Sequence, residues 1–407
     1  MNFLFFLFCF LNLYGPFSTN LTFAFNIVLF LAVNSKRMRV AYERVFVTIP
    51  IMLLIIAISA VIFTHAPERD YTVIGLYSRM LVNCVVFPSI IYFFYQKRIK
   101  ILEILSLTLF LHCVVVLLQM IFASLQELNH LLFRFSRETE LLENFTMRRL
   151  GLTGSYDSSG LYSAISTVLA LELSYLTSKK KYIIVSVVSL IGSLFTSRTG
   201  MAAAFLSIVL CVLLNKKSTT KRFGSTFLYM AILSLSLAYF ILPVILVTMG
   251  LSSGSEMDYE DYGYGSRTGE ILFVDHLLPL ESLTTRELIL GYGVGIRKAV
   301  RLLYSSDIGY VKQIYEVGIV GVVLMVYFSI LMAVRTYLRY KMVRYNMELK
   351  IGSQLMLVLL LLYLIFNYKN QLLYNVCVFE VFLFVYYFLL CHFRKLKGEY
   401  IKREITS

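Results

Sequence analysis

Long apolar runs alternate with short polar segments along the whole chain. A membrane-spanning helix needs about 20 mostly apolar residues, and the pattern predicts twelve such helices. They cover approximately residues 2–16, 20–35, 45–65, 72–95, 101–124, 159–178, 182–197, 200–215, 224–248, 311–334, 351–366 and 372–392. The first, second, seventh, eighth and eleventh are short for a full crossing, so half-membrane or re-entrant geometry is open for these.

Basic residues mark alternate loops between these segments. Lys and Arg collect in short cytoplasmic loops and are rarer in the loops on the other side. In this chain they concentrate in every second loop and in the C-terminal tail, within residues 36–44, 97–100, 179–181, 216–222, 335–350 and 394–403. This alternation predicts that both termini are cytoplasmic.

Two loops on the opposite side are long, covering about residues 125–158 and 250–309. Long loops between packed helices commonly carry function. The second begins with an acidic run from Glu256 to Asp261, continues as ILFVDHLLPLESLTTREL, which is typical of a helix, and ends in GYGVG. We expect it to fold partly against the membrane surface. The chain is therefore predicted to be a single all-α transmembrane domain, residues 1–407, with two functional loops.

The composition agrees with a membrane protein. Hydrophobic residues make up 58% of the chain, charged residues 15%, and the mean hydropathy is +0.75. This is more apolar surface than a water-soluble fold can bury. The net charge of +14 would suggest nucleic-acid binding in a soluble protein, but here the basic loops are explained by membrane orientation. No nucleic-acid partner is expected.

The sequence contains no pattern typical of metal or nucleotide binding. Its six cysteines lie inside apolar runs, without a CxxC pair or neighbouring ligands, so neither disulfides nor zinc are expected. There is no Asp-rich pair for a divalent cation and no GxGxxG motif for a dinucleotide. We expect no cofactor and no metal.

Arg198 is the most informative basic residue on the long-loop side. It lies in SRTG, a turn of a few residues between two short apolar segments. A permanently charged guanidinium at the membrane boundary is costly without an anionic partner. The alternative is a turn arginine whose side chain extends to the interface; we favour the functional interpretation.

Arg148 and Arg149 directly precede the turn LGLTGSYDSSG, which opens the next apolar segment. Backbone N–H groups of such a turn, the positive end of the following helix and two guanidiniums together form a phosphate-sized anion site. A simple interfacial turn is an equal alternative.

The second long loop contains another set of candidates. Arg267 lies between glycines in GSRTGE, and Asp307, Tyr310 and Lys312 lie at the start of the tenth apolar segment in SSDIGYVK. A helix N-cap is the strong alternative for Asp307.

The order of these motifs resembles the O-antigen polymerase family (Wzy-type), which forms a superfamily with the O-antigen ligases. The resemblance consists of RxxGLTGSYDSSG, the SRTG turn, a long loop with an arginine before a helix, LGYGVG and SDIGYVKQIYEVGIVG, over about residues 148–321, together with the twelve-span layout. Arg149 and Gly160 also fit the RX10G pattern of such polymerases, whereas the second loop has no clean copy of it.

The resemblance implies a glycosyltransferase in the bacterial inner membrane. It would join oligosaccharide repeat units, carried on undecaprenyl pyrophosphate, into O-antigen polysaccharide on the periplasmic side, with a chain-length regulator protein as a conceivable partner. An O-antigen ligase, which transfers the finished chain to the lipid A core, is one alternative. A polysaccharide flippase or transporter is another. Transporters usually carry polar and charged residues near mid-span, where this chain has few apart from Arg79, Asn83 and Glu172.

The implied reaction assigns roles to the candidate residues. The leaving group is a lipid pyrophosphate whose charge increases in the transition state, so arginines at head-group depth suit it. We predict that Arg198 and Arg267 act in catalysis and that the pyrophosphate site contains Arg148, Arg149, Gly160, Arg198 and Arg267.

The acceptor side requires a base for the attacking sugar hydroxyl. Ligases of the superfamily have a His near the start of the span after the long loop, where this chain has Asp307, so Asp307 is the predicted catalytic base. His276, Asp157 and the acidic run are alternatives. We predict an acceptor site that includes Asp157, Tyr310 and Lys312.

Overall fold

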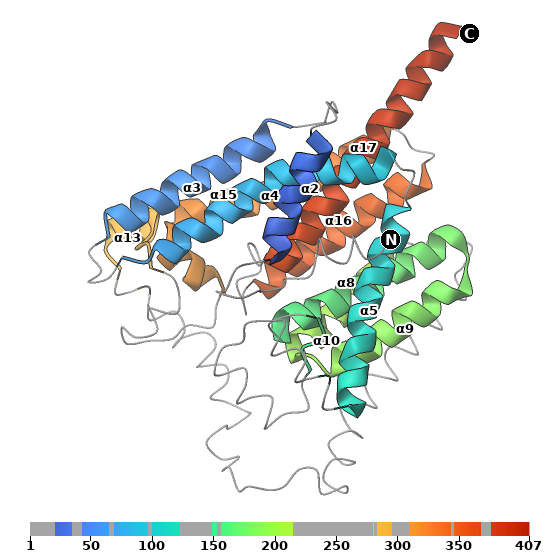
Figure 1. Cartoon of the computed structure of the whole chain (residues 1–407), viewed down its shortest axis with the longest axis horizontal. Coiled ribbons are helices and arrows are strands. Elements are labelled where there is room, and N and C mark those ends of the chain that lie inside the picture. The colour runs from blue at the N-terminus through green and yellow to red at the C-terminus, as the bar shows by residue number, and fades with distance from the viewer. Residues whose placement is uncertain are drawn as a thin grey trace, which may run out of the picture.

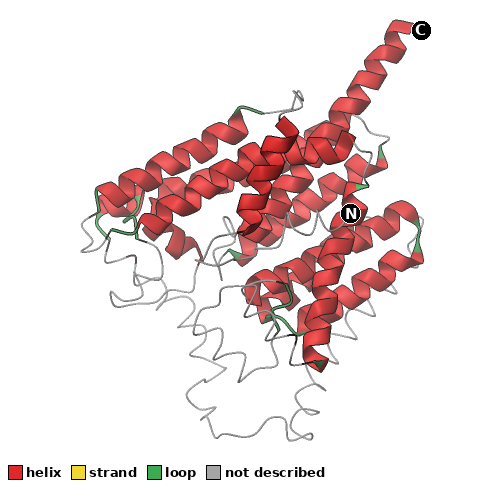
Figure 2. Cartoon of the chain, viewed as in Figure 1, coloured by secondary structure: helices red, strands yellow, loops and turns green. Residues whose placement is uncertain are grey.

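The computed structural model describes residues 21–34, 43–64, 69–96, 100–122, 149–152, 156–214, 283–294, 309–342, 346–367 and 376–406, and the single residues 125 and 280. Apart from a 3-10 residue, all regular structure in these ranges is α-helical (Figure 2). The predicted all-α class is confirmed for this part of the chain.

Ten of the twelve predicted segments coincide with helices. These helices are α2 (Leu21–Asn34), α3 (Val45–Ile62), α4 (Tyr71–Gln96), α5 (Ile101–Ile121), α8 (Tyr156–Thr177), α9 (Lys180–Leu194), α10 (Arg198–Leu214), α15 (Gly309–Met342), α16 (Met347–Phe366) and α17 (Val376–Thr406). The other two predicted segments, 2–16 and 224–248, lie outside the described residues. Among the described helices, α3, α4, α5, α15 and α16 are long and apolar enough to cross a membrane. The chain thus has the character of a multi-pass membrane protein.

The helices form two groups that α16 connects. One group contains α5, α8, α9 and α10, and the other contains α2, α3, α4, α15 and α17 (Figure 1). Helix α16 packs against α8 and α10 of the first group and against α15 and α17 of the second.

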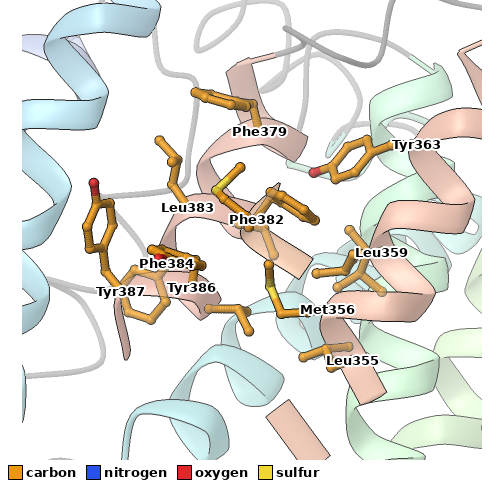
Figure 3. Packing of buried hydrophobic residues seen from close by; sticks show 14 of the residues in the cluster. Leu355, Met356, Leu359, Tyr363, Phe379, Phe382, Leu383, Phe384, Tyr386 and Tyr387 are labelled. Carbon is orange, nitrogen blue, oxygen red and sulfur yellow. The ribbon is translucent and has the colours of Figure 1, made fainter. Parts of the chain in front are cut away.

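Aromatic and aliphatic side chains fill the contact between α16 and α17. Figure 3 shows Tyr363, Leu359 and Met356 of α16 near Phe382 of α17, and the Tyr363 and Phe382 rings meet edge to face at 5.0 Å. Gly352 of α16 also allows close approach of α17: a Cβ added there would lie 2.1 Å from a methyl carbon of Leu389, so a larger residue does not fit. This part of the core therefore depends on close packing of both large and small residues.

Small hydroxyl side chains fill the contact between α8 and α9. Ser166 and Ser189 share a hydrogen bond of 2.8 Å, and the Ser186 hydroxyl donates to the Thr167 carbonyl oxygen at 2.8 Å. Lipid is as apolar as leucine, so helices in a membrane associate through close packing of small residues and interhelical hydrogen bonds. These serines explain why a short helix such as α9 is held firmly against its neighbours.

The ends of the helices define two opposite faces of the bundle. His392 of α17 lies 3.2 Å from the hydroxyl of Tyr95 near the end of α4, and 3.2 Å from Asn346, the N-cap of α16. The Gln354 amide near the start of α16 donates to the Leu214 carbonyl at the end of α10. We call this side the basic face and the other side the loop face. At the basic face, α3, α5, α9 and α16 begin and α4, α8, α10 and α15 end.

Glu43 ties three helices together on the basic face. It lies just before α3, forms ion pairs with Arg335 and Arg339 near the end of α15, and accepts a hydrogen bond of 2.8 Å from the Tyr386 hydroxyl of α17. Burial alone would raise the pKa of the Glu43 carboxyl, but the charge of Arg339 and hydrogen bonds from Tyr386, Arg335 and Arg339 lower the pKa below its ordinary value.

Replacement of this carboxylate should have a pH-dependent effect on stability. A lowered pKa in the folded state stabilises the fold above the ordinary glutamate pKa, and this stabilisation is lost as pH falls through the lowered value. We expect Glu43→Gln to lower the melting temperature of the detergent-solubilised protein at neutral pH, and the difference from wild type to shrink below about pH 4. A difference that stays constant from neutral to acid pH would contradict this account of the ion pairs.

Candidate functional site

Polar side chains of α5 hold the turn 149–152 in place. The Gln119 side-chain oxygen accepts from the Gly151 N–H at 2.9 Å, and its amide donates to the Gly151 carbonyl at 3.3 Å. The Arg149 Nε donates to the Gln119 carbonyl at 3.1 Å. Gly151 has a φ of 58°, and an added Cβ would lie 2.4 Å from the His112 ring, so only glycine fits without strain. The turn that carries Arg149 is thus fixed on the end of α5.

His112 joins the same turn to α8. Its Nδ1 accepts from the Leu152 N–H at 2.9 Å, so the proton of the neutral ring is on Nε2. That nitrogen lies 3.1 Å from the Ser159 hydroxyl and 3.2 Å from the Ser159 carbonyl oxygen. Both ring nitrogens of this buried histidine therefore have partners, which indicates a structural role in the site.

The SRTG segment lies beside this turn. The Arg149 N–H donates to the Phe195 carbonyl at the end of α9 at 2.7 Å. Ser197 caps the next helix, with its hydroxyl oxygen accepting from the Gly200 N–H at 2.9 Å, as expected of an N-cap serine. Arg198 is the first residue of α10. Two motifs that are separated in sequence by all of α8 and α9 therefore meet at the loop face.

A contact between two glycines brings the N-terminal parts of α8 and α10 together. A Cβ added at Gly200 would lie 2.2 Å from the Gly160 Cα, and one added at Gly160 would lie 2.6 Å from the Gly200 Cα. Neither position accepts a side chain without separation of the helices. The role of Gly160 in the sequence pattern is thus steric: it permits backbone contact between α8 and α10.

This contact places two helix N-termini side by side on the loop face. Gly160 is in the second turn of α8 and Gly200 in the first turn of α10, so the two termini lie about 6 Å and about 3 Å from the contact along their helix axes. The first N–H groups of a helix and its positive dipole end attract anions. With Arg149 fixed beside both termini, the arrangement suits a phosphate or pyrophosphate group.

The structure brings four of the predicted residues to this place. Arg149 and Gly160 are in the contacts described above, Arg198 begins α10, and Asp157 lies in the first turn of α8. The side chains of Arg198 and Asp157 lie outside the described part of the chain. The same is true of Arg148, Arg267, His276 and Asp307 as whole residues.

Helix α15 is interrupted at Gly318, and the GYG part of the GYGVG motif packs against this interruption. Gly318 has a non-helical φ of 68° and ψ of 179°, so the expected continuous span consists of two helical pieces. The N–H groups of Tyr292 and Gly293 donate to the Tyr315 carbonyl oxygen at 2.7 and 2.9 Å. A Cβ at Gly318 would lie 2.2 Å from the Ile289 carbonyl oxygen. The backbone of the turn therefore satisfies a helix carbonyl at the break.

A short helix, α13 (Thr285–Leu290), leads into this turn. Thr284 and Glu287 form a capping box, in which the Glu287 carboxylate accepts from the Thr284 N–H at 2.8 Å and the Thr284 hydroxyl oxygen accepts from the Glu287 N–H at 3.4 Å. Gly293 touches α3, because an added Cβ would lie 2.5 Å from the Ala60 carbonyl carbon. The described residues of this loop therefore pack against α3 and α15, whereas the expected folding of the loop against the membrane surface stays a prediction.

Tyr310 and Lys312 lie apart from the glycine contact. Tyr310 donates from its hydroxyl to the Leu364 carbonyl at 2.7 Å, and Gln313 exchanges amide hydrogen bonds of 3.0 and 3.3 Å with Asn367. These contacts attach the start of α15 to the end of α16 on the loop face. Since α16 also packs against α8 and α10, Tyr310 and Lys312 lie on the same face as the anion site. Asp157, the third residue of the predicted acceptor site, is instead in the first turn of α8, so the structure does not bring the three together.

The intramembrane charges found in the sequence are paired with other buried groups. Asn83 donates to Glu380 of α17 at 3.1 Å, and Arg79 lies 4.0 Å from the same carboxylate. Glu172 accepts from the Cys211 thiol at 3.2 Å. Sequence analysis did not single out Glu380, or the buried Glu316 of α15, although each is an isolated carboxylate in an apolar run.

His112 and Gln119 are the site residues that sequence analysis missed. A signal was present, because they are polar residues two helical turns apart on one face of a predicted apolar helix. Their partners, the backbone groups of residues 149–152, could not be inferred from that spacing.

Comparison of the chain with protein-family models finds no match, and comparison with curated proteins finds none either.

Proposed function

We propose that the chain is an inner-membrane glycosyltransferase that polymerises undecaprenyl-pyrophosphate-linked oligosaccharide repeat units into O-antigen polysaccharide. The observation that supports this most directly is the contact of Gly160 with Gly200, which joins the N-termini of α8 and α10 beside Arg149. Such a site suits the one group common to all donors of this reaction, a lipid pyrophosphate.

In the proposed reaction, a hydroxyl of the acceptor sugar attacks the anomeric carbon of the donor, and the bond from that carbon to the pyrophosphate oxygen breaks. Negative charge on the leaving oxygen increases in the transition state, where fixed cationic and N–H groups stabilise it most. Arg149, Arg198 and Arg267, with Arg148, neutralise this charge. The helix N-termini contribute a preorganised field without a change in protonation.

The orientation follows from charge. Among the described basic residues, Arg44, Lys100, Lys179, Lys180 and Lys350 lie at helix ends on the basic face, and Arg394 follows His392 of α17 on the same face. We infer that this face is cytoplasmic. The loop face is then periplasmic, where lipid-linked repeat units are available and nucleotide sugars are not. The full topology of twelve spans with both termini in the cytoplasm belongs to this proposal.

Deletion of the gene tests the proposed reaction against its rivals. Loss of a polymerase should leave lipopolysaccharide with core plus one repeat unit, because single units are still flipped and ligated. The measurement is the lipopolysaccharide band pattern on a gel, with a plasmid-borne copy of the gene as control. Bare core in the deletion strain would contradict the polymerase and leave a ligase or a flippase.

We assign the base to Asp307, with Tyr310 and Lys312 nearby on the acceptor side. Asp307→Asn keeps the hydrogen-bonding shape and any helix-capping role, but an amide cannot take a proton. We expect the variant to be present in the membrane and to assemble little polymer, measured as the lipopolysaccharide ladder. Wild-type assembly by Asp307→Asn would mean that Asp307 is only a helix cap, and the base would then be sought among Asp157, Asp261 and His276.

A further inference from the structure

A cavity of about 870 Å³ opens at the basic face, opposite the candidate site. The ends of α4 and α8, the starts of α5, α9 and α16, and the middle third of α17 form its walls. It therefore lies where the two helix groups meet, next to the bridging helix α16. A volume of this size accommodates a small-molecule ligand or part of a lipid.

The rim of the cavity is basic. Lys100, Lys179 and Lys395 line it, and each of these residues is exposed. The two carboxylates of the lining are already engaged with bases: Glu103 lies 3.4 Å from the Lys100 ammonium, and Glu348 lies 3.4 Å from the His392 ring. The lining thus contains more cationic than acidic groups, which favours the binding of an anion.

Helix termini add to this preference. Helices α5, α9 and α16 direct their positive N-terminal ends to the cavity, whereas α4 and α8 direct negative C-terminal ends there. Three positive ends against two negative ends leave a modest net positive field. The lysines remain the main attraction for an anion.

The inner walls are apolar, and hydrogen-bonding side chains line another part of the cavity. Leu102, Leu173 and Phe388 line the walls. On one side, the Tyr95 hydroxyl lies 3.2 Å from the His392 Nδ1, and the His392 ring stacks on Phe388. A ligand that fits has a phosphate for the lysines, hydroxyl groups for the tyrosine and histidine, and a hydrocarbon part for the leucines.

We propose that this cavity binds an anionic phospholipid, with its phosphate between Lys179 and Lys395 and the first part of an acyl chain against Leu102 and Leu173. The lysines lie at the level where helices begin and end, which is head-group depth in a bilayer. Basic pockets between helix ends are suited to anionic lipid head groups. The bound lipid links the two helix groups on the basic face, independently of the reaction at the loop face.

The test uses the purified full-length protein in a non-ionic detergent. Phosphatidylglycerol should raise the melting temperature in a saturable manner, because a ligand that binds the folded state stabilises it. Phosphatidylethanolamine, which has no net charge, should have a much smaller effect. The double variant Lys179→Glu and Lys395→Glu should bind phosphatidylglycerol about tenfold or more weakly.

The matched control reverses two neighbouring lysines that do not line the cavity. Lys180→Glu with Lys397→Glu makes the same change in net charge at exposed positions, and its affinity for phosphatidylglycerol should stay near that of wild type. Equal losses in the two double variants would show a general charge effect and overturn the proposal. Equal stabilisation by phosphatidylethanolamine would also overturn it, as would equal stabilisation by soluble glycerol 3-phosphate at the same concentration.

A second variant covers the case in which the charge reversals disturb folding. Leu176 is a partly buried wall residue of the cavity, and Leu176→Trp leaves every charge in place while it reduces the space. It should decrease the number of phosphatidylglycerol molecules that native mass spectrometry finds on the protein. Unchanged lipid occupancy in Leu176→Trp would exclude the cavity as the binding place.

Discussion

Arg198→Ala should abolish the polymer ladder while the protein remains in the membrane at wild-type abundance. Arg198 is the first residue of α10, beside the turn of Arg149, and Arg198→Ala leaves the backbone hydrogen bonds of the helix unchanged. Loss of a guanidinium that binds a pyrophosphate should weaken binding by about 10- to 100-fold. The lipopolysaccharide ladder measures activity, and the melting-temperature shift caused by an isoprenyl pyrophosphate lipid measures binding.

Two further variants make this test specific. Arg198→Lys should also be poor, because an ammonium cannot reproduce bidentate binding. Arg286→Ala is the matched control: Arg286 is an exposed arginine on the same face whose guanidinium lies 5.4 Å from the centre of the Phe63 ring. Full ladder formation by Arg198→Ala would contradict the pyrophosphate assignment. Equal losses at Arg198 and Arg286 would instead indicate that the variants measure folding of the loop face.

Gly200→Ala and Gly160→Val should each eliminate most of the polymer by separating the N-termini of α8 and α10. The added Cβ at Gly200 would lie 2.2 Å from backbone, and backbone cannot move aside as a flexible side chain can. Overpacking of this kind costs about 1–3 kcal/mol, so a lower melting temperature should accompany the loss of polymer.

Gly75→Ala is the control for a glycine in a helix of the same bundle. No atom lies within 4 Å of a Cβ added at Gly75, so this variant should keep both the ladder and the melting temperature. Normal binding of an isoprenyl pyrophosphate lipid by Gly200→Ala would show that the contact supports only folding. Reduced binding at temperatures well below its melting point would support the contact as part of the anion site.

The helices themselves were predictable from the sequence because burial in lipid demands long apolar segments. In the described part of the chain, the helices α2, α3, α4, α5, α8, α9, α10, α15, α16 and α17 each correspond to a predicted segment. Their boundaries differ most where polar residues continue a helix beyond the apolar run, as in α17, which extends to Thr406. The break at Gly318 was also beyond prediction, since it depends on the GYG turn that contacts it.

The candidate site was predictable only in part. Arg149 and Arg198 stood out because a charge at a membrane boundary is costly, and Gly160 stood out through the RX10G pattern that it forms with Arg149. His112 and Gln119 lie in a different predicted helix and act through hydrogen bonds to backbone groups. Hydrogen bonds to backbone leave no mark in the partner's sequence, so the spacing of residues could not reveal them.

The sequence by itself determined which segments are helices and which helix ends carry basic residues, because both properties depend on each segment's own composition. Only the tertiary structure decided that Gly160 meets Gly200 and that Glu380 pairs with Asn83. Such contacts depend on which helices pack together and at what rotation. Inside a membrane that choice is made by small residues and single hydrogen bonds between distant segments, whereas hydropathy reports only that each segment prefers lipid to water.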